Sequence, residues 1–347
     1  MTPINQGLSA PKSAPKTGSR PLFFLIALIL PLAFFALAEM VLRVAGIGAY
    51  PPLFVPTENV DGYLQPNEAV IHRFFTHFSQ APKVSIDTTY FHETKPDDTL
   101  RIVVMGGSSA AGFPYGKWAS PAGMLKRRLR RSFPERDIEV ISTAMSAMNS
   151  YALLDFTDEI IEIAPDAVVI YAGHNEYLGV LGVGSAYSSS QSPRLTRVIQ
   201  GLRKLNLYRA IETALGRKVD ASNAPRGTLM ARIAGERAIE YQSALYNKGV
   251  EQFRSNMSVA LRRFERAGVP VYLGTLASNL RDQAPFDGGA PGDGASIDRQ
   301  INDGVAALTA GDVDAALRAL TAAAEKAPTA ADAHFHLGRA YLQKQEP

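Results

Sequence analysis

A serine that follows two glycines is the side chain in this sequence that is best placed to do chemistry. Ser108 comes directly after Gly106 and Gly107, and residues 102–105 before them form an apolar run that predicts a strand buried on both faces. Glycine allows a tight turn and leaves room for a ligand against the backbone. Because ligands bind beyond the carboxyl ends of strands in an open parallel sheet, Ser108 stands where a nucleophile would stand. A loop serine that caps a helix is the alternative interpretation.

The residues around Ser108 exclude three common site motifs. They contain no G-x-S-x-G, which excludes the nucleophile elbow of the α/β-hydrolases. Gly106, Gly107 and Gly112 do not form G-x-G-x-x-G, the fingerprint of dinucleotide-binding folds. No Gly-Lys-Ser or Gly-Lys-Thr follows them, so a phosphate-binding loop is excluded as well.

A second apolar run is followed by a polar motif, in the same arrangement as residues 102–109. Residues 167–172 predict another buried strand, and Gly-His-Asn-Glu follows at 173–176. A strand into Gly-Gly-Ser-Ser and a later strand into Gly-x-Asn-Glu resemble blocks I and III of the SGNH (GDSL-type) hydrolases. The resemblance implies that Ser108 is the nucleophile and that the side-chain amide of Asn175 donates to the oxyanion.

The same resemblance assigns the remaining members of the site, with departures from the family pattern. Residues 138–141 predict a strand, and the family places near Ala144 a glycine whose backbone N–H joins that of Ser108 in the oxyanion hole. Gly107 and Glu176 replace family aspartates, and we expect both to rim the pocket. These departures favour a divergent branch of the family over a typical lipase.

The order of elements predicts the fold that must position these residues. Residues 99–286 alternate strands and helices, which indicates an α/β fold, and the resemblance implies an SGNH-like three-layer α/β/α sandwich with a parallel sheet. The fourth strand is predicted at 269–276. Its exit, residues 277–286, resembles a loop of membrane-anchored SGNH proteins that carry tetratricopeptide repeats. On this basis Asn279 and Asp282 rim the pocket, and a role in a turn is the alternative.

The pattern of the first 45 residues predicts a membrane anchor at the N-terminus. Residues 1–20 are rich in Ser, Pro, Gly and Lys and are expected to form a disordered cytoplasmic tail. Residues 21–45 predict a transmembrane helix, because 21–38 are apolar and uncharged and basic residues precede them. The bulk of the chain then faces the periplasm or the cell exterior. A signal peptide cleaved after Ala38 is the alternative, although the apolar run exceeds the usual signal core of about 7–15 residues.

Several features exclude other classes of partner. Residues 46–98 have no clear period and are interpreted as a lead-in that packs on the catalytic domain. The spacing of His72, His77 and His92 within it is not that of a metal site, and the chain has no cysteine. The net charge of +3 is modest, and the basic run at 126–131 is interpreted as a solvated helix face. We therefore expect no metal, no cofactor and no nucleic acid.

The C-terminal part of the sequence has another composition. Residues 287–296 are a linker rich in Gly, Ala and Asp, and residues 297–347 are alanine-rich and helical. Their pattern fits incomplete tetratricopeptide repeats, which are expected to offer a surface to a protein partner. His334 and His336 are interpreted as ordinary helix residues within these repeats.

A serine hydrolase also needs a base, which the SGNH pattern supplies as Asp-x-x-His after the last strand. No such motif follows Ile163. His174 lies too near the oxyanion side to serve as the base. We therefore expect the sequence to be a C-terminally truncated fragment, inactive by itself, whose catalytic histidine lies beyond residue 347.

Two functional hypotheses follow. The first is a membrane-anchored esterase, or an enzyme that transfers an O-acyl group, acting on ester bonds through an acyl-serine, with extracellular glycans as a suggested substrate. The second is a catalytically inert SGNH-like platform whose repeats bind a protein.

Overall fold

The computed structural model describes residues 20–58, 60–74, 86–173, 175–185, 192–215, 239, 241–285 and 294–345. The chain divides into two compact units. One contains residues 1–50 and 204–215, and the other contains residues 51–203 and 216–347.

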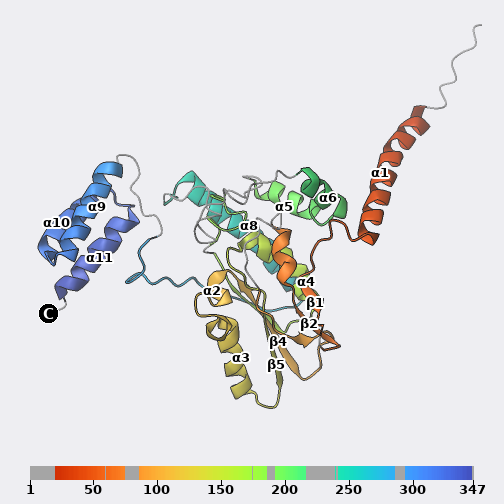
Figure 1. The fold of residues 1–347 in the computed structure, drawn as a ribbon, viewed down its shortest axis with the longest axis horizontal. Coiled ribbons are helices and arrows are strands. Elements are labelled where there is room, and N and C mark those ends of the chain that lie inside the picture. Colours follow the sequence, from red (N-terminus) through yellow and green to blue (C-terminus); the bar gives the residue numbers. More distant parts are fainter. Residues whose placement is uncertain are drawn as a thin grey trace, which may run out of the picture. The chain divides into compact units, whose positions relative to one another are not determined.

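A four-stranded parallel sheet forms the centre of the larger unit. Its strands, in the spatial order β5-β4-β6-β7, are β4 (Thr99–Gly106), β5 (Asp137–Ser142), β6 (Ala167–Tyr171) and β7 (Val271–Leu273) (Figure 1). All four apolar runs that predicted strands form strands, although β7 is shorter than the run at 269–276. The predicted parallel sheet is thereby confirmed.

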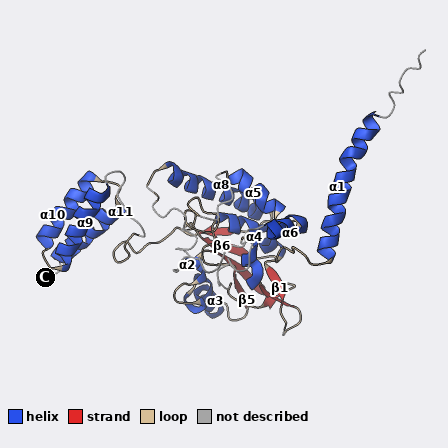
Figure 2. Cartoon of the chain, turned by 45° about the horizontal axis from the view of Figure 1, so that its top comes forward, coloured by secondary structure: helices blue, strands red, loops and turns tan. Residues whose placement is uncertain are grey.

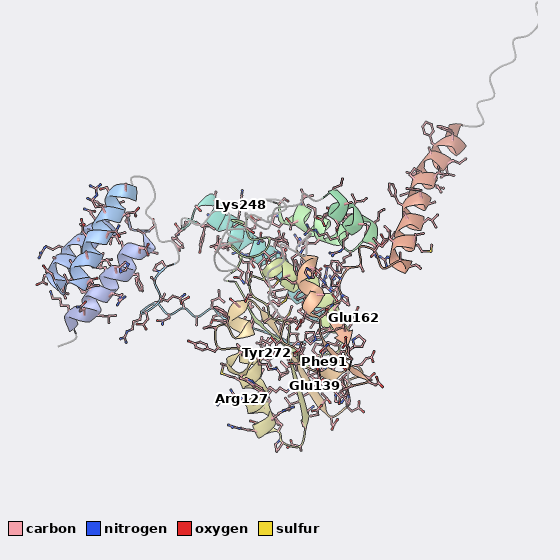
Figure 3. The ribbon with its side chains drawn as sticks, in the orientation of Figure 1. Phe91, Arg127, Glu139, Glu162, Lys248 and Tyr272 are labelled. Atoms are coloured by element: carbon pink, nitrogen blue, oxygen red, sulfur yellow. The ribbon has the colours of Figure 1, made fainter. Side chains whose placement is uncertain are left out.

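Helices cover both faces of this sheet. Val103 and Met105 of β4 join a core that also contains Phe156 of α4 (Ser150–Glu162) and Phe264 of α8 (Ala244–Arg266). Val104, whose side chain points to the other face, packs with residues of α3 (Pro121–Ser132) instead. Figure 2 shows α3 on the side of the strands away from α4 and α8. The basic run on α3, with Arg127 labelled in Figure 3, is largely exposed, as predicted.

The lead-in segment contains regular structure that the sequence did not predict. Three short strands, β1 (Phe54–Pro56), β2 (Tyr63–Pro66) and β3 (Phe91–His92), form an antiparallel sheet, and a 3₁₀-helix, η2, spans Glu68–Arg73. Their apolar side chains belong to the same core as β4 and α4. The described part of this segment from residue 51 onward thus packs on the domain, and residues 46–50 belong to the other unit. The predicted bounds of the lead-in stay a prediction. His77 lies outside the described residues.

Short and long helices complete the described structure. Between the strands lie α2 (Ser108–Ala111), the 3₁₀-helix η3 (Lys117–Ala119), α5 (Pro193–Leu202) and α6 (Asn206–Leu215). The C-terminal part forms α9 (Gly294–Thr309), α10 (Val313–Lys326) and α11 (Ala331–Gln345), with an alanine-rich core of their own. Helix α9 begins at Gly294, within the range predicted as a linker, and residues 287–293 of that range lie outside the described residues. The assignment of these helices to tetratricopeptide repeats stays a prediction.

The N-terminal helix α1 spans Arg20–Val44. Within it, the 22 residues Phe23–Val44 are apolar enough to cross a membrane, and a signal sequence has the same properties. The predicted apolar helix is confirmed. Its membrane insertion and the side that the chain faces stay predictions.

Candidate functional site

Ser108 begins α2 at the carboxyl end of β4, one of the two inner strands of the sheet. Its side chain is half-buried, whereas that of Ser109 is exposed. Gly106 is tightly enclosed, since a side chain there would run into the carbonyl oxygen of Tyr171 and lie 2.6 Å from the Cβ atom of Ala110. The chain therefore turns sharply at the two glycines. The serine lies just beyond the carboxyl end of β4.

Asn175 lies beside Gly107, the residue before Ser108, although 68 positions separate Asn175 from Gly107 in the chain. A Cβ atom at Gly107 would stand only 2.5 Å from Asn175 Nδ2, so the amide occupies the space that a larger residue at 107 would need. Asn175 is 5% exposed, and its Nδ2 donates to the carbonyl oxygen of Met148 at 2.8 Å. An amide nitrogen has two hydrogens, and among the described residues the second has no acceptor. The loops after β4, β5 and β6 therefore meet at one place.

The loop after β5 contains the predicted oxyanion donor Ala144. Its backbone N–H is directed at the hydroxyl oxygen of Ser142, 3.4 Å away, and the residue is 1% exposed. This N–H thus has an acceptor within its own loop. Its role in the site stays a prediction.

Ala147, three residues further on, has features that the sequence did not reveal. Its φ is +66°, a left-handed conformation that is uncommon for alanine and occurs preferentially at functional sites. Across the described part of the chain, its N–H has no acceptor. The carbonyl of the next residue, Met148, accepts the hydrogen bond from Asn175. A glycine at 147 would have signalled this turn in the sequence, but an alanine gives no such signal.

Glu176, predicted to rim the pocket, is a buried brace. Its Oε1 accepts from the backbone N–H of Ser150 at 2.6 Å, and its Oε2 accepts from the Ser150 hydroxyl at 2.8 Å and from Gln252 Nε2 at 2.9 Å. Asn256 Nδ2 donates to the same hydroxyl at 3.0 Å. Burial raises the pKa of Glu176, and these hydrogen bonds offset the rise only in part. The network joins the Asn175 loop to the start of α4 and to α8.

The predicted rim residues after β7 have a local role. Asn279 Oδ1 accepts from the backbone N–H of Asp282 at 3.0 Å, and both side chains are exposed. This bond caps a local turn, and Asn279 also lines a cavity of about 660 Å³ together with Ser109. Both the pocket-rim role and the turn role therefore stay predictions.

A mostly apolar cavity lies at the carboxyl ends of β6 and β7. Its volume is about 460 Å³. The lining includes Gly173, Tyr177, Phe253, Leu273 and Leu276. Glu176 also reaches this cavity, so it lines a hollow next to Asn175 while its carboxylate bonds to α4 and α8.

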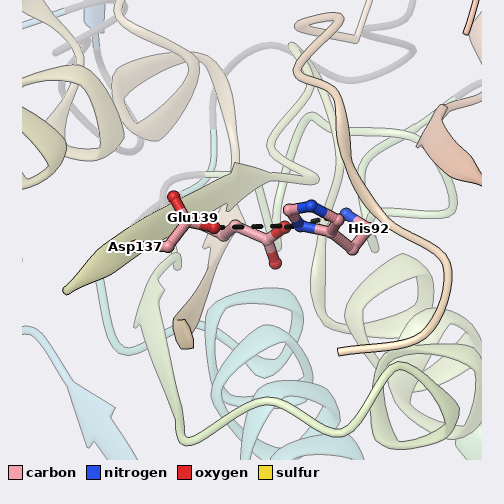
Figure 4. A group of neighbouring side chains, drawn as sticks. All are labelled: His92, Asp137 and Glu139. Carbon is pink, nitrogen blue, oxygen red and sulfur yellow. Dashed lines mark hydrogen bonds and ion pairs between the residues drawn. The ribbon is translucent and has the colours of Figure 1, made fainter. Parts of the chain in front are cut away.

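A second group of titratable side chains lies at the opposite, amino-terminal end of the sheet. His92, Asp137 and Glu139 bring three ligand atoms within 4.8 Å of one another, a spacing that can hold a metal ion (Figure 4). His92 Nδ1 lies 2.7 Å from Glu139 Oε1, and Nε2 lies 2.8 Å from the hydroxyl of Tyr63. Figure 3 labels Phe91 and Glu139 in this region.

The contacts of Arg101 indicate whether His92, Asp137 and Glu139 form a metal site or a structural ion-pair network. Its side chain is 1% exposed, and its Nε donates to Glu139 Oε2 at 2.6 Å. Its Nη1 donates to the carbonyl of Ile163, and its Nη2 donates to that of His92, both at 2.6 Å. Burial raises the pKa of Glu139, but bonds from His92 and Arg101 outweigh burial and hold the pKa below its ordinary value. Because a guanidinium already neutralises the carboxylate and both imidazole nitrogens are engaged, the donor set fits a structural brace rather than a cation site.

No base for Ser108 can be assigned from these contacts. His174, which directly precedes Asn175, lies outside the described residues. His92 is held at the other end of the sheet. Among the described residues, Gly107, Asn175 and the 144–148 loop come together next to Ser108, and the position of Asn279 and Asp282 at the pocket rim stays a prediction.

Comparison with known proteins gives structural matches only. No family model and no curated protein sequence matches this chain. Similar solved structures include AlinE4, described as an SGNH-hydrolase family esterase, with 19% identity over 49% of this chain and 74% of that chain and a TM-score of 0.24. TesA matches with 15% identity over 50% of this chain and 76% of that chain, again with a TM-score of 0.24. The structural neighbours thus include SGNH-hydrolase family esterases.

Proposed function

We propose that this protein is a membrane-anchored serine hydrolase of the SGNH type that acts on ester bonds. The observation that carries the proposal is the position of the Asn175 amide, whose Nδ2 lies 2.5 Å from where the Cβ atom of a side chain at Gly107, the residue directly before Ser108, would stand. Ser108 and Asn175 follow two neighbouring strands, and a serine hydroxyl and a side-chain amide are the groups that a nucleophile and an oxyanion donor require.

In the proposed mechanism the Ser108 oxygen attacks the carbonyl carbon of an ester. The carbonyl oxygen gains negative charge, and the backbone N–H of Ser108 and the second hydrogen of Asn175 Nδ2 donate to it. Collapse of this intermediate expels the alcohol, which takes the proton lost by Ser108, and an acyl-serine remains. Water releases the acid, or another hydroxyl accepts the acyl group. The base that relays the proton is unassigned.

A third oxyanion donor comes from the loop after β5. We favour the N–H of Ala147 over that of Ala144, because Ala147 has a left-handed backbone and an N–H without an acceptor among the described residues. The Ala144 N–H is directed at Ser142. An oxyanion donor that is already oriented and free of other bonds loses less on binding the developing charge.

The proposed substrate is an ester presented outside the cytoplasm, and acylated extracellular glycans are one class of such esters. Helix α1 supports this location, since its apolar length suits a membrane anchor that follows a basic N-terminal tail. The cavity of about 460 Å³ beside Asn175 supplies a mostly apolar space at the same end of the sheet.

A fluorophosphonate probe tests the proposal, because it reacts covalently with activated serines only. The natural protein in its own membranes is treated with the probe, and the labelled peptide is identified by mass spectrometry. We expect the label on Ser108, its loss in Ser108→Ala, and its retention in Ser109→Ala, a matched control at the exposed neighbouring serine. Hydrolysis of an activated acetyl ester should follow the same pattern.

Absence of the label from Ser108 in the natural protein would overturn the enzyme proposal. It would favour the alternative, an inert platform whose C-terminal helices bind a protein partner.

A further inference from the structure

The smaller unit contains a helix, α6, whose two faces differ. On one face, Asn206 is 7% exposed, and its Nδ2 donates to the carbonyl of Ile47 at 2.9 Å. A Cβ atom at Gly48 would meet the carbonyl oxygen of Asn206 and lie 3.1 Å from the backbone nitrogen of Ala210. This face therefore packs tightly against the turn that follows α1.

The opposite face of α6 carries an apolar stripe whose last two residues are exposed in the described structure, whereas its first residue, Tyr208, is half-buried. With 3.6 residues per turn, Tyr208, Ile211 and Leu215 align along one side of the helix. Ile211 is 47% exposed and Leu215 is 78% exposed. Thr213, which is also exposed, lies on the other side of the helix from Leu215 and Ile211. An apolar stripe of this kind needs a partner.

The first residues of α6 are tied to the last turns of α1. The carboxylate of Glu39 accepts from the backbone N–H of Asn206 at 3.1 Å and from that of Leu207 at 2.8 Å. It also accepts from Arg43 Nε at 2.7 Å. A carboxylate at a helix N-terminus satisfies N–H groups that have no partner within the helix. The start of α6 therefore lies level with Glu39, close to the end of α1 (Figure 1).

The length of α1 then sets the depth of α6 relative to a membrane. The 22 residues Phe23–Val44 measure about 33 Å at 1.5 Å per residue, close to the roughly 30 Å of a hydrocarbon core. The end of α1 and Glu39 then lie near the membrane surface. Beside them, Lys204 and Arg209 lie 6.0 and 5.6 Å from the ring centre of Tyr50. Tyrosine and basic side chains are typical of the membrane–water interface.

We propose that α6 lies in the membrane interface, with Tyr208, Ile211 and Leu215 inserted at the boundary between headgroups and acyl chains. The occupant of the stripe is the lipid of the leaflet in which α1 ends. Continuity with the apolar surface of α1 and the basic residues at its start support this partner over a protein. The inference rests on the proposed anchoring of α1, and it adds a second membrane contact about 160 residues further along the chain.

The absence of cysteine from the sequence makes a direct test possible. The substitutions Ile211→Cys, Leu215→Cys and the matched control Thr213→Cys are each made in the whole chain. Each cysteine is labelled with a fluorophore whose emission reports polarity. The proteins are reconstituted in phosphatidylcholine–phosphatidylglycerol vesicles, with and without a nitroxide attached to the lipid. A fourth variant, Leu32→Cys in the middle of α1, reports the anchor.

We expect labels at 211 and 215 to emit at shorter wavelength and to be quenched by the lipid nitroxide several-fold more than the label at 213. Emission from 211 and 215 as water-like as that from 213 overturns the proposal. Shielded emission without quenching by the lipid also overturns it, because a protein surface then covers the stripe. Quenching at 32 but not at 211 or 215 refutes the role of α6 alone, whereas no quenching at 32 refutes the anchor and the role of α6 with it. None of these results depends on the reactivity of Ser108, so the failure of this proposal is distinguishable from the failure of the proposed enzyme activity.

Discussion

The two ends of the parallel sheet carry side chains that differ in how far their hydrogen bonds are satisfied. At the amino end, Arg101, Glu139 and His92 bond to one another and to backbone carbonyls. At the carboxyl end, within the described residues, Asn175 Nδ2 has one acceptor for its two hydrogens and the Ala147 N–H has none. The amino end has the residue types that usually suggest catalysis or a metal, but its donors and acceptors are occupied.

The difference teaches that residue type is a weaker guide to chemistry than unsatisfied bonding capacity. A buried ion pair with full hydrogen bonding is rigid and has little left to offer a ligand. Ser108 and Asn175, which lie next to glycines at the carboxyl end of the sheet, are less conspicuous residue types. They nevertheless have hydrogen-bond donors that a ligand can use. Three substitutions test whether the two ends of the sheet differ in this way.

The largest effect is expected from Arg101→Met, which should destabilise the fold and leave the chemistry intact. Without the guanidinium, the carboxylate of Glu139, 6% exposed, remains buried without its charge partner. Breaking such a pair costs about 3–5 kcal/mol of unfolding free energy. Urea unfolding followed by circular dichroism measures the loss.

The matched control for Arg101→Met is Arg128→Met, at an exposed position of α3. It should change the unfolding free energy by less than about 0.5 kcal/mol. If the two variants were equally stable, the amino end would not be a brace, and the comparison between the two ends would fail.

A somewhat smaller free-energy effect, seen in kinetics instead of stability, is expected from Asn175→Ala. Loss of one oxyanion donor typically lowers kcat by about 10²–10³-fold, and KM should change little because the amide serves the transition state. Steady-state kinetics on an activated acetyl ester measure both constants. Asn247→Ala, at an exposed position near the start of α8, is the control. An unchanged kcat would remove Asn175 from the site.

The smallest effect is expected from Gln252→Leu, which removes one bond to Glu176. A lost hydrogen bond to a charged group costs about 1.5–3 kcal/mol at most, and Ser150 still holds the carboxylate. We expect a modest loss of stability and a several-fold fall in kcat at constant KM, because Glu176 positions the neighbouring Asn175. A fall in stability without any change in kcat would make the network a brace for α4 and α8 only.

The sequence predicts the strands of the parallel sheet well because each is a run of apolar, mostly β-branched residues. It also places Ser108 and Asn175 at strand ends that adjoin in the sheet. It predicts neither the strands of the lead-in, which are two to four residues long, nor Ala147, whose conformation depends on its neighbours. The partners of Arg101 lie 9, 38 and 62 positions away. No local pattern can reveal bonds of that range.

The ion pair between Arg101 and Glu139 also helps to fix the register in which β4 and β5 pair. The two residues are opposite each other in the sheet, and β4 continues from Arg101 to the glycines before Ser108. A slip of one residue would turn every side chain of β4 to the other face. It would withdraw the guanidinium from the acceptors of Glu139, Ile163 and His92. The ion pair at one end of the strand thus excludes the misaligned sheets in which the serine at the other end would face away from Asn175.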